Sequence, residues 1–370
     1  MMKERKKNRR VLWGITAGLA LASLLFFLLA AHLGDKLTSQ QMAARWKGES
    51  EMNFAQVSCY VPVDEKLSLE KIYAFRQELQ KALHNAAVDL SSDGQLQLDA
   101  WSTSGKLNAA TELGKGEARV IAVGGDFFQF HPVRLLNGSY IQESDLMKDL
   151  VLLDEDLAWI LFGGTQLQGM TFRLEGIPFV VGGVVEREQD GFSRLAYTGG
   201  MGLYMSYDSY ARLVENAGID CYEFVSAEPV KGFALNLARD KFPVGRGEIL
   251  QNTDRFSFTR LVRIIGSVGT RSMQTQGIIY PYWENAARSA EDLCALYLAL
   301  GVLYGVFPAV ILAASLLHLL KLGKEKFTEV WFPGVRDSAE EVVRKRQRRR
   351  WEKKHGLAPK RESRGRHEKE

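Results

Sequence analysis

The chain has few of the residues that build disulfide scaffolds, metal sites or catalytic centres. Its 370 residues include three cysteines and six histidines, and three cysteines are too few to staple a small secreted fold. The histidines form no i, i+4 pair and have no cysteine partner at the spacing of a metal site. The motifs G-x-S-x-G and H-E-x-x-H are also missing. We therefore expect no metal, no cofactor and no enzymatic activity.

Charged residues are absent from two long apolar runs, residues 11–32 and 293–320. Each run exceeds the roughly 20 residues that a helix needs to cross a bilayer, so both are predicted to be transmembrane helices. A cleaved signal peptide is the alternative for the first run, with Leu29-Ala30-Ala31 as a weak cleavage site. The length of the run favours an uncleaved anchor.

Basic residues gather outside these two runs. Residues 1–10 carry a net charge of +5 and residues 321–370 carry +8, whereas the rest of the chain is acidic. Lys and Arg beside a membrane span stay on the cytoplasmic side. The charge pattern predicts a two-pass protein of the plasma membrane, with both termini in the cytoplasm and an extracytoplasmic central domain.

The segment between the runs alternates strand and helix patterns. Strands are predicted at 52–62, 95–102, 118–123, 220–225 and 248–251, and helices begin at Ser68, Ser206 and Pro229. This order is typical of a split α+β sandwich with an inserted lobe. We expect a juxtamembrane linker at 33–50, an α+β lobe at 51–123 and 201–256, an inserted β-rich lobe at 124–200 and a helical stalk at 257–292.

The predicted insertion contains a distinctive pattern. It begins GGDFFQFHPVRLLNGSYIQESDL at residue 124 and continues VLLDEDLAWILFGGTQLQGMTFRLEGIPFVVGGVVE at residue 151. This pattern resembles the periplasmic core domain of MacB-type and FtsX-like ABC transporter permeases. The matching positions include Val123, Asp126, Phe127, Phe128, Leu135, Gly138, Asp145, Ala158, Leu161, Phe162, Gly163, Gly169, Gly176, Val181, Gly183 and Val184. The resemblance implies an extracytoplasmic α+β domain, a split β-α-β porter-like lobe with a small β-rich lobe, held by two transmembrane helices.

The motif residues suit structural roles. Phe127 and Phe128 offer large buried area where the chain enters the inserted lobe. Gly163 is placed to end a helix over 154–162 with a positive φ. Gly169 and Gly183 are typical of turns or bulges beside short strands.

The membrane part differs from the family that the motif resembles. Permeases of that family have three spans after the outer domain, whereas this chain has one. The resemblance implies a partner or regulator that works with a separate ABC ATPase and a full-length permease, passing mechanical work between membrane and outer domain. The alternative is a free-standing, surface-displayed binding or scaffold domain without an ABC partner.

The C-terminal tail is the largest predicted cytoplasmic surface. Ser338 and Glu341 have the spacing of a capping box, which predicts the start of a helix. Its basic face contains Arg344, Arg346, Arg348, Arg349 and Arg350. This basic face is predicted either to contact anionic membrane lipid or to dock to an ATPase subunit. No fold feature indicates nucleic-acid binding.

Three further details leave alternatives open. Cys59 and Cys221 lie in strand-like stretches outside the membrane, either as one disulfide or as two buried free thiols in neighbouring strands. Tyr280, Tyr282 and Trp283 precede the second run and are predicted to form an aromatic belt at the outer membrane interface. Gly301 and Gly305 form a small-xxx-small pattern. Either this pattern allows close packing on the first span or on a partner helix, as in a homodimer, or it reflects the ordinary glycine content of membrane helices.

Overall fold

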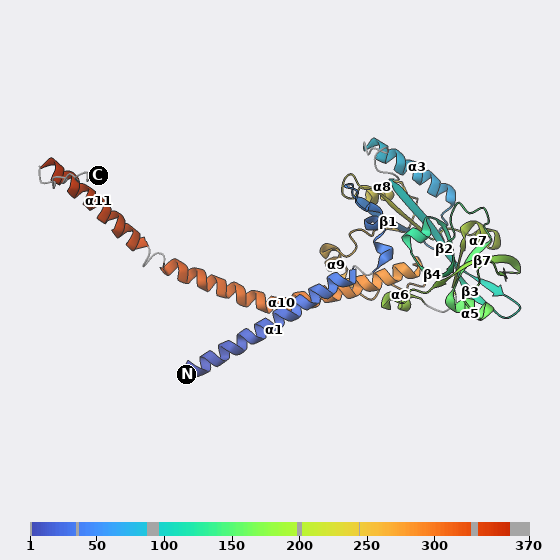
Figure 1. Cartoon of the computed structure of the whole chain (residues 1–370), viewed down its shortest axis with the longest axis horizontal. Helices are drawn as coiled ribbons and strands as arrows, with labels where there is room; N and C mark the ends of the chain where they lie inside the picture. Colours follow the sequence, from blue (N-terminus) through green and yellow to red (C-terminus); the bar gives the residue numbers. More distant parts are fainter. Residues whose placement is uncertain are drawn as a thin grey trace, which may run out of the picture. The chain divides into compact units, whose positions relative to one another are not determined.

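The computed structural model describes residues 2–34, 37–86, 96–197, 202–243, 245–326 and 332–355. The chain divides into two compact units, Ser23–Val302 and the combination of Met1–Ala22 with Leu303–Glu370. The first unit holds the β-sheet and the candidate site. The second contains the remaining turns of the two long helices and helix α11 (Phe332–Lys354) (Figure 1).

Two helices contain the apolar runs, α1 (Met2–Gly34) and α10 (Tyr282–Lys326). Both are long and apolar enough to cross a membrane. The Ser23 hydroxyl of α1 donates a 2.7 Å hydrogen bond to the Gly301 carbonyl of α10. A Cβ at Gly301 would lie 3.1 Å from the Phe27 ring. The first span is therefore the helix that packs on Gly301, and the glycine allows this close approach.

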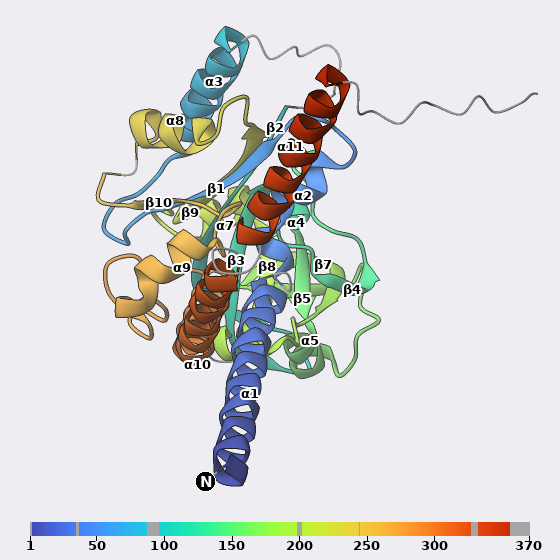
Figure 2. The same cartoon turned by 90° about the vertical axis from the view of Figure 1, so that its left-hand side faces the viewer.

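Half of the domain is a split β-α-β sandwich. Strands β1 (Phe54–Tyr60), β2 (Gln97–Ala110), β9 (Cys221–Ala227) and β10 (Glu248–Gln251) lie in the order β10-β1-β9-β2, and β9 is antiparallel to both β1 and β2. In the first β-α-β unit, β9 lies between β1 and β2. In the second, β1 lies between β9 and β10. This is the split arrangement that the sequence predicts. Helices α3 (Leu69–Asn85) and α8 (Phe233–Lys241) pack beside each other on this part of the sheet (Figure 2). The helix expected after Ser206 is α7 (Tyr207–Leu213).

Aromatic side chains fill the space between these helices and the sheet. Phe75 of α3 makes edge-to-face contacts with Phe224 and Phe242 at ring-centroid distances of 5.3 and 5.0 Å. Ile72, Leu79 and Leu83 lie on the same buried face of α3. This apolar spacing is the reason that the sequence predicts the helix.

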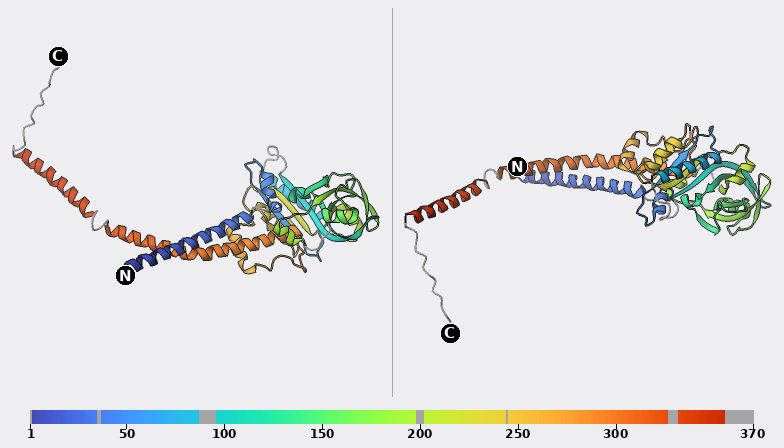
Figure 3. Two further views of the ribbon diagram at one scale, coloured as in Figure 1. Left: turned by 60° about the horizontal axis from the view of Figure 1, so that its bottom comes forward. Right: turned by 90° about the horizontal axis from the view of Figure 1, so that it is seen from above.

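The other half of the domain is a closed ring of strands. Strand β3 (Lys115–Gly125) pairs with β8 (Gly202–Ser206), which pairs with β5 (Leu150–Asp154), and β5 pairs with β7 (Ile177–Glu186). Strand β6 (Thr171–Leu174) pairs with both β7 and β2 and thereby closes the ring, while β4 (Arg134–Gly138) adds to β7. Figure 3 shows these strands as a ring. Helix α5 (Glu155–Phe162) packs on β3, β5, β7 and β8 with Leu157, Ala158 and Leu161 buried, while its outer side is exposed. Closure removes the unpaired edges of β2 and β7 in this region.

Some expectations about element boundaries are wrong. Helix α8 begins at Phe233, four residues after the predicted Pro229, because Gly232 before it has a left-handed backbone with φ +84°. Strand β2 continues eight residues beyond the predicted end at residue 102, because its second half leaves the sandwich and pairs within the ring. Ser338 does not cap a helix, because α11 begins at Phe332. Its hydroxyl instead donates to the Gly334 carbonyl one turn earlier, at 2.8 Å.

Candidate functional site

The first turns of α10 are buried inside the domain. Tyr282 and Trp283 are 6% and 2% exposed. The indole ring of Trp283 lies 4.3 Å from the His131 ring and 5.5 Å from the Phe127 ring, and Tyr282 stacks on Tyr197 at 4.1 Å. The predicted aromatic belt is therefore wrong, because these rings belong to the domain core. The helix that contains the second apolar run therefore begins as a core element of the domain.

The DFF motif supplies the other side of this aromatic contact. Asp126 precedes the short helix α4 (Phe127–Phe130) and accepts a hydrogen bond from the Gln129 side-chain amide. Burial raises the pKa of the Asp126 carboxyl. Phe127 faces Trp283, while Phe128 stacks on Tyr140 at 5.0 Å. The motif thus positions α4 against the start of α10.

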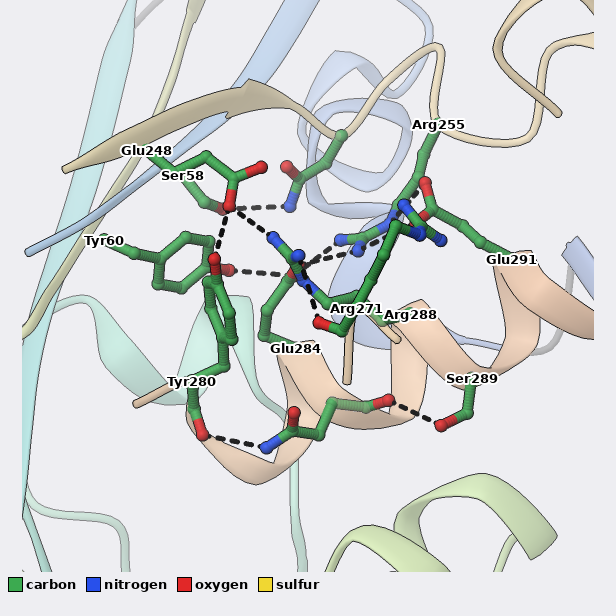
Figure 4. Close-up of polar contacts among 12 residues, drawn as sticks. Ser58, Tyr60, Glu248, Arg255, Arg271, Tyr280, Glu284, Arg288, Ser289 and Glu291 are labelled. Atoms are coloured by element: carbon green, nitrogen blue, oxygen red, sulfur yellow. Dashed lines mark hydrogen bonds and ion pairs between the residues drawn. The ribbon is translucent and has the colours of Figure 1, made fainter. Parts of the chain in front are cut away.

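An ion network holds the next turns of α10 (Figure 4). Its centre is Arg255, which follows β10 and is fully buried. The guanidinium donates two hydrogen bonds to the Glu284 carboxylate, at 2.6 and 2.7 Å. Its Nε lies 3.1 Å from one carboxylate oxygen of Glu291 without hydrogen-bond geometry, and another guanidinium nitrogen donates a hydrogen bond to the second oxygen at 3.4 Å. Both glutamates are also fully buried, so each charge depends on its partners.

A second arginine extends the network toward the sheet. Arg288 donates to Glu284 at 2.7 Å and to Glu248 of β10 at 2.6 Å. Its guanidinium carbon lies 3.8 Å from the centre of the Tyr280 ring, whose hydroxyl donates to the same Glu248 at 2.6 Å. The Tyr60 hydroxyl of β1 donates to Glu284 at 2.9 Å. Two strands of the sandwich are thereby bonded to one face of α10.

The network also includes a residue from the turn after α1 and two arginines from the segment between β10 and α10. Gln40, in the turn η1 (Thr38–Gln40) that follows α1, accepts a 3.0 Å hydrogen bond from Arg255. Arg260 and Arg271 each pair with Glu291, at 3.1 and 2.9 Å. Arg271 also pairs with Asp292 at 2.8 Å. The segments that follow α1 and begin α10 therefore meet at one cluster.

The charges of this cluster are balanced. Its arginines are Arg255, Arg260, Arg271 and Arg288, and its acids are Glu248, Glu284, Glu291 and Asp292. Burial favours the neutral form of Arg255, but Glu284 and Glu291 raise its pKa above the usual value. A buried network of this kind contributes little net stability compared with apolar residues, yet losing one member leaves unpaired charge. Such an arrangement favours one rotation and one height of α10 relative to the sheet.

This cluster is not among the sites predicted from the sequence. Glu284, Arg288 and Glu291 stand at positions i, i+4 and i+7, so they share one face of a helix. A charged face immediately before an apolar run is a readable signal. The distant partner Arg255 has no sequence signal, because only the fold brings the end of β10 to this face of α10.

The motif glycines lie in the ring of strands, away from the cluster. Gly138 has φ +87°, and a Cβ there would lie 2.1 Å from the Gly182 carbonyl oxygen. A Cβ at Gly183 would lie 2.5 Å from the Asn137 carbonyl oxygen, so β4 and β7 approach closely at both positions. Gly163 ends α5 in the left-handed region with φ +74°, and Gly169 has φ +84°.

The remaining predicted residues have separate locations. Leu135 of β4 pairs with Val185 beside a β-bulge, and Phe162 at the end of α5 contacts Phe172 edge-to-face. Cys59 and Cys221 are buried free thiols on the paired strands β1 and β9. Burial raises the pKa of both thiols. The five tail arginines all lie on α11 and are exposed: Arg344, Arg346, Arg348, Arg349 and Arg350.

These features define a membrane-anchored protein whose α+β outer domain is built around the start of a long apolar helix. Residues 14–238 match the family model described as the MacB-like periplasmic core domain. The chain belongs to this family, which is found in ABC transporter permeases. No curated protein matches the chain.

Two solved structures illustrate the resemblance. One is the extracellular domain of the noncanonic ABC-type transporter YknZ from Gram-positive bacteria, 15% identical, with a TM-score of 0.36 and coverage of 54% of this chain and 100% of the other. The second is the periplasmic region of MacB from Actinobacillus actinomycetemcomitans, 16% identical, with a TM-score of 0.36 and coverage of 53% and 88%.

Proposed function

We propose that this chain is a permease-like subunit that couples its extracytoplasmic domain to a separate ATPase in the cytoplasm. The observation that carries the proposal is the continuity of α10. One helix of 45 residues begins in the domain core at Tyr282 and continues through the apolar run. A displacement of this helix would pull directly on the sandwich through Glu284 and Glu291, because moving either carboxylate away from Arg255 would leave buried charge with fewer partners.

In this proposal both termini lie in the cytoplasm, in agreement with their basic residues. The domain grips or senses a partner outside the membrane and does mechanical work without forming a channel. The basic face of α11 docks to the ATPase or rests on anionic lipid. A full-length permease, or a second copy of this chain, supplies the further spans that the family uses.

Co-purification in mild detergent tests the proposal. The bait is the full chain, and one variant replaces the five tail arginines by Gln: Arg344, Arg346, Arg348, Arg349 and Arg350. A matched control replaces five Lys or Arg within residues 1–10 by Gln, which removes the same charge from the other terminus. Proteins recovered with each bait are identified by mass spectrometry.

Recovery of an ABC ATPase with the wild type and the control, and not with the tail variant, would support coupling through α11. Equal recovery with all three baits would support an ATPase partner and refute the tail as its docking site. Recovery of neither an ATPase nor a permease with any bait would favour the free-standing surface domain.

A further inference from the structure

A stripe of exposed apolar side chains follows the ion network. Helix α9 (Phe258–Ile264) continues into the turn η2 (Ile265–Ser267). Phe258, Val262 and Ile265 are 60%, 45% and 41% exposed. Their spacing of four and three residues places them along one line of the helix surface. Three large exposed apolar side chains in one line form a contiguous apolar patch, and such a patch is typical of a site that contacts a protein, a ligand or a membrane.

The neighbouring edge of α9 packs against the two long helices. Leu261 is buried with Cys294, Ala295 and Leu298 of α10, and Leu33 at the end of α1 packs on the same cluster. Figure 2 shows α9 beside α10. These residues of α1 and α10 are the outer ends of the two apolar runs. Helix α9 therefore lies at the level where the membrane spans meet the domain.

The polar edge of α9 faces the domain. Arg260 pairs with Glu291 and donates to the Gln251 carbonyl at 3.2 Å. Thr259 and Arg263 occupy the exposed polar side. The helix is thus amphipathic, with one part of its apolar arc on the spans, the other part open, and its polar side directed to the ion network and to solvent.

A groove lies between the open edge of α9 and α1. Its volume is about 530 Å³. Apolar side chains that include Phe27, Ala30, Phe258, Leu261 and Leu298 line one part of it, and polar residues line the rest: Gln40, Gln41, Asn252, Thr253, Asp254 and Ser257. Phe27 and Ala30 belong to the predicted first span, so the apolar part of the groove adjoins the apolar surface of α1, and its polar part adjoins the domain.

We propose that α9 and η2 dock into the outer leaflet of the membrane, with Phe258, Val262 and Ile265 among the lipid chains. Lipid is the occupant that fits, because the stripe and the apolar part of the groove extend the apolar surface of the two spans at their outer ends, while the polar part of the groove suits the lipid headgroups. An amphipathic helix of this type sits roughly 5–10 Å into the boundary between headgroups and acyl chains. The exposed Arg263 then lies at the level of the lipid phosphates. Through Arg260 and Glu291, this contact sets the height of the domain above the bilayer.

Spin labelling of the full chain in vesicles of phosphatidylethanolamine and phosphatidylglycerol tests this placement. One variant carries Val262→Cys, and the matched control carries Leu113→Cys, an exposed apolar position (79% exposed) on the turn between β2 and β3. The wild type, whose three cysteines are buried, measures background labelling. Relaxation enhancement by oxygen, which concentrates in lipid, is compared with enhancement by a neutral nickel chelate, which stays in water.

The proposal expects a several-fold higher oxygen-to-nickel ratio at Val262→Cys than at Leu113→Cys. Equal ratios would place α9 in water and overturn it. Protection from both reagents, with broadening of the spectrum between labels, would show that a second copy covers the stripe and would also overturn it. The result is independent of any ATPase, so this proposal and the proposed function can fail separately.

Discussion

Replacing Arg255 by Met tests whether the ion network holds α10 in the domain. The variant removes two hydrogen bonds from Glu284, one from Gln40, and one hydrogen bond together with an ion pair from Glu291, while keeping most of the side-chain volume. Glu284 retains Arg288 and Tyr60, and Glu291 retains Arg260 and Arg271, so neither carboxylate is left wholly unpaired. The cluster nevertheless gains a net negative charge in a fully buried place.

Removing one partner of a buried ion pair costs about 3–5 kcal/mol. For a domain of this size, each kcal/mol lowers the melting temperature by roughly 2–4 °C, so Arg255→Met should melt about 6–20 °C below the wild type. The measurement is thermal unfolding of the full chain in detergent, followed by intrinsic fluorescence, because Trp283 lies in the affected region.

Arg246→Met is the matched control. This arginine also pairs with two carboxylates, Asp64 and Glu65, but its side chain is 71% exposed, and exposed pairs contribute about 0–1 kcal/mol. The double variant Arg255→Met with Glu284→Gln should lose less stability than the two single variants added together, by about 0.5–3 kcal/mol, because it removes both charges of one pair. If Arg255→Met has the same melting temperature as Arg246→Met, the ion network does not hold α10 in the domain.

Three further predictions concern other parts of the domain. Burial raises the pKa of Asp154 to about 6, so the folded state binds a proton more tightly than the unfolded chain. The free energy of unfolding of the wild type should therefore rise by roughly 1 kcal/mol from pH 7 to pH 5 relative to Asp154→Asn. Chemical denaturation at the two pH values measures this gain, and an equal difference between the two proteins at both would contradict it. Gly138→Ala should cost at least about 1–3 kcal/mol, because it combines a positive φ with an approach of 2.1 Å to the Gly182 carbonyl; Gly164→Ala, where no atom lies within 4 Å, is the control in the same melting assay, and equal melting would contradict the argument. Phe127→Ala should cost about 3–5 kcal/mol and change the fluorescence of Trp283, whereas a loss of stability without a spectral change would separate the motif from α10.

The apolar spacing of α3 and the runs of strand-forming residues were sufficient to predict most of the sandwich. The local pattern predicts these elements, because the spacing of apolar residues along a helix or strand shows which of its faces is buried. The length of β2 was not predictable in this way, because its second half is fixed by pairing with β6 across a gap of more than sixty residues. The closure of the ring follows from that pairing.

The sequence by itself determined the two spans, the family and the split sandwich, because apolar length, the DFF motif and periodicity are local or contiguous properties. Tertiary structure alone decided the role of Tyr282 and Trp283, which the linear sequence assigns to the membrane interface. The fold buries Trp283 against Phe127 and Tyr282 against Tyr197. It also decided the partners of Glu284 and Glu291. From the sequence, a charged residue beside an apolar run is expected to be exposed to solvent. Glu284 and Glu291 can be buried because Arg255 and the other arginines of the cluster are brought to them by the fold.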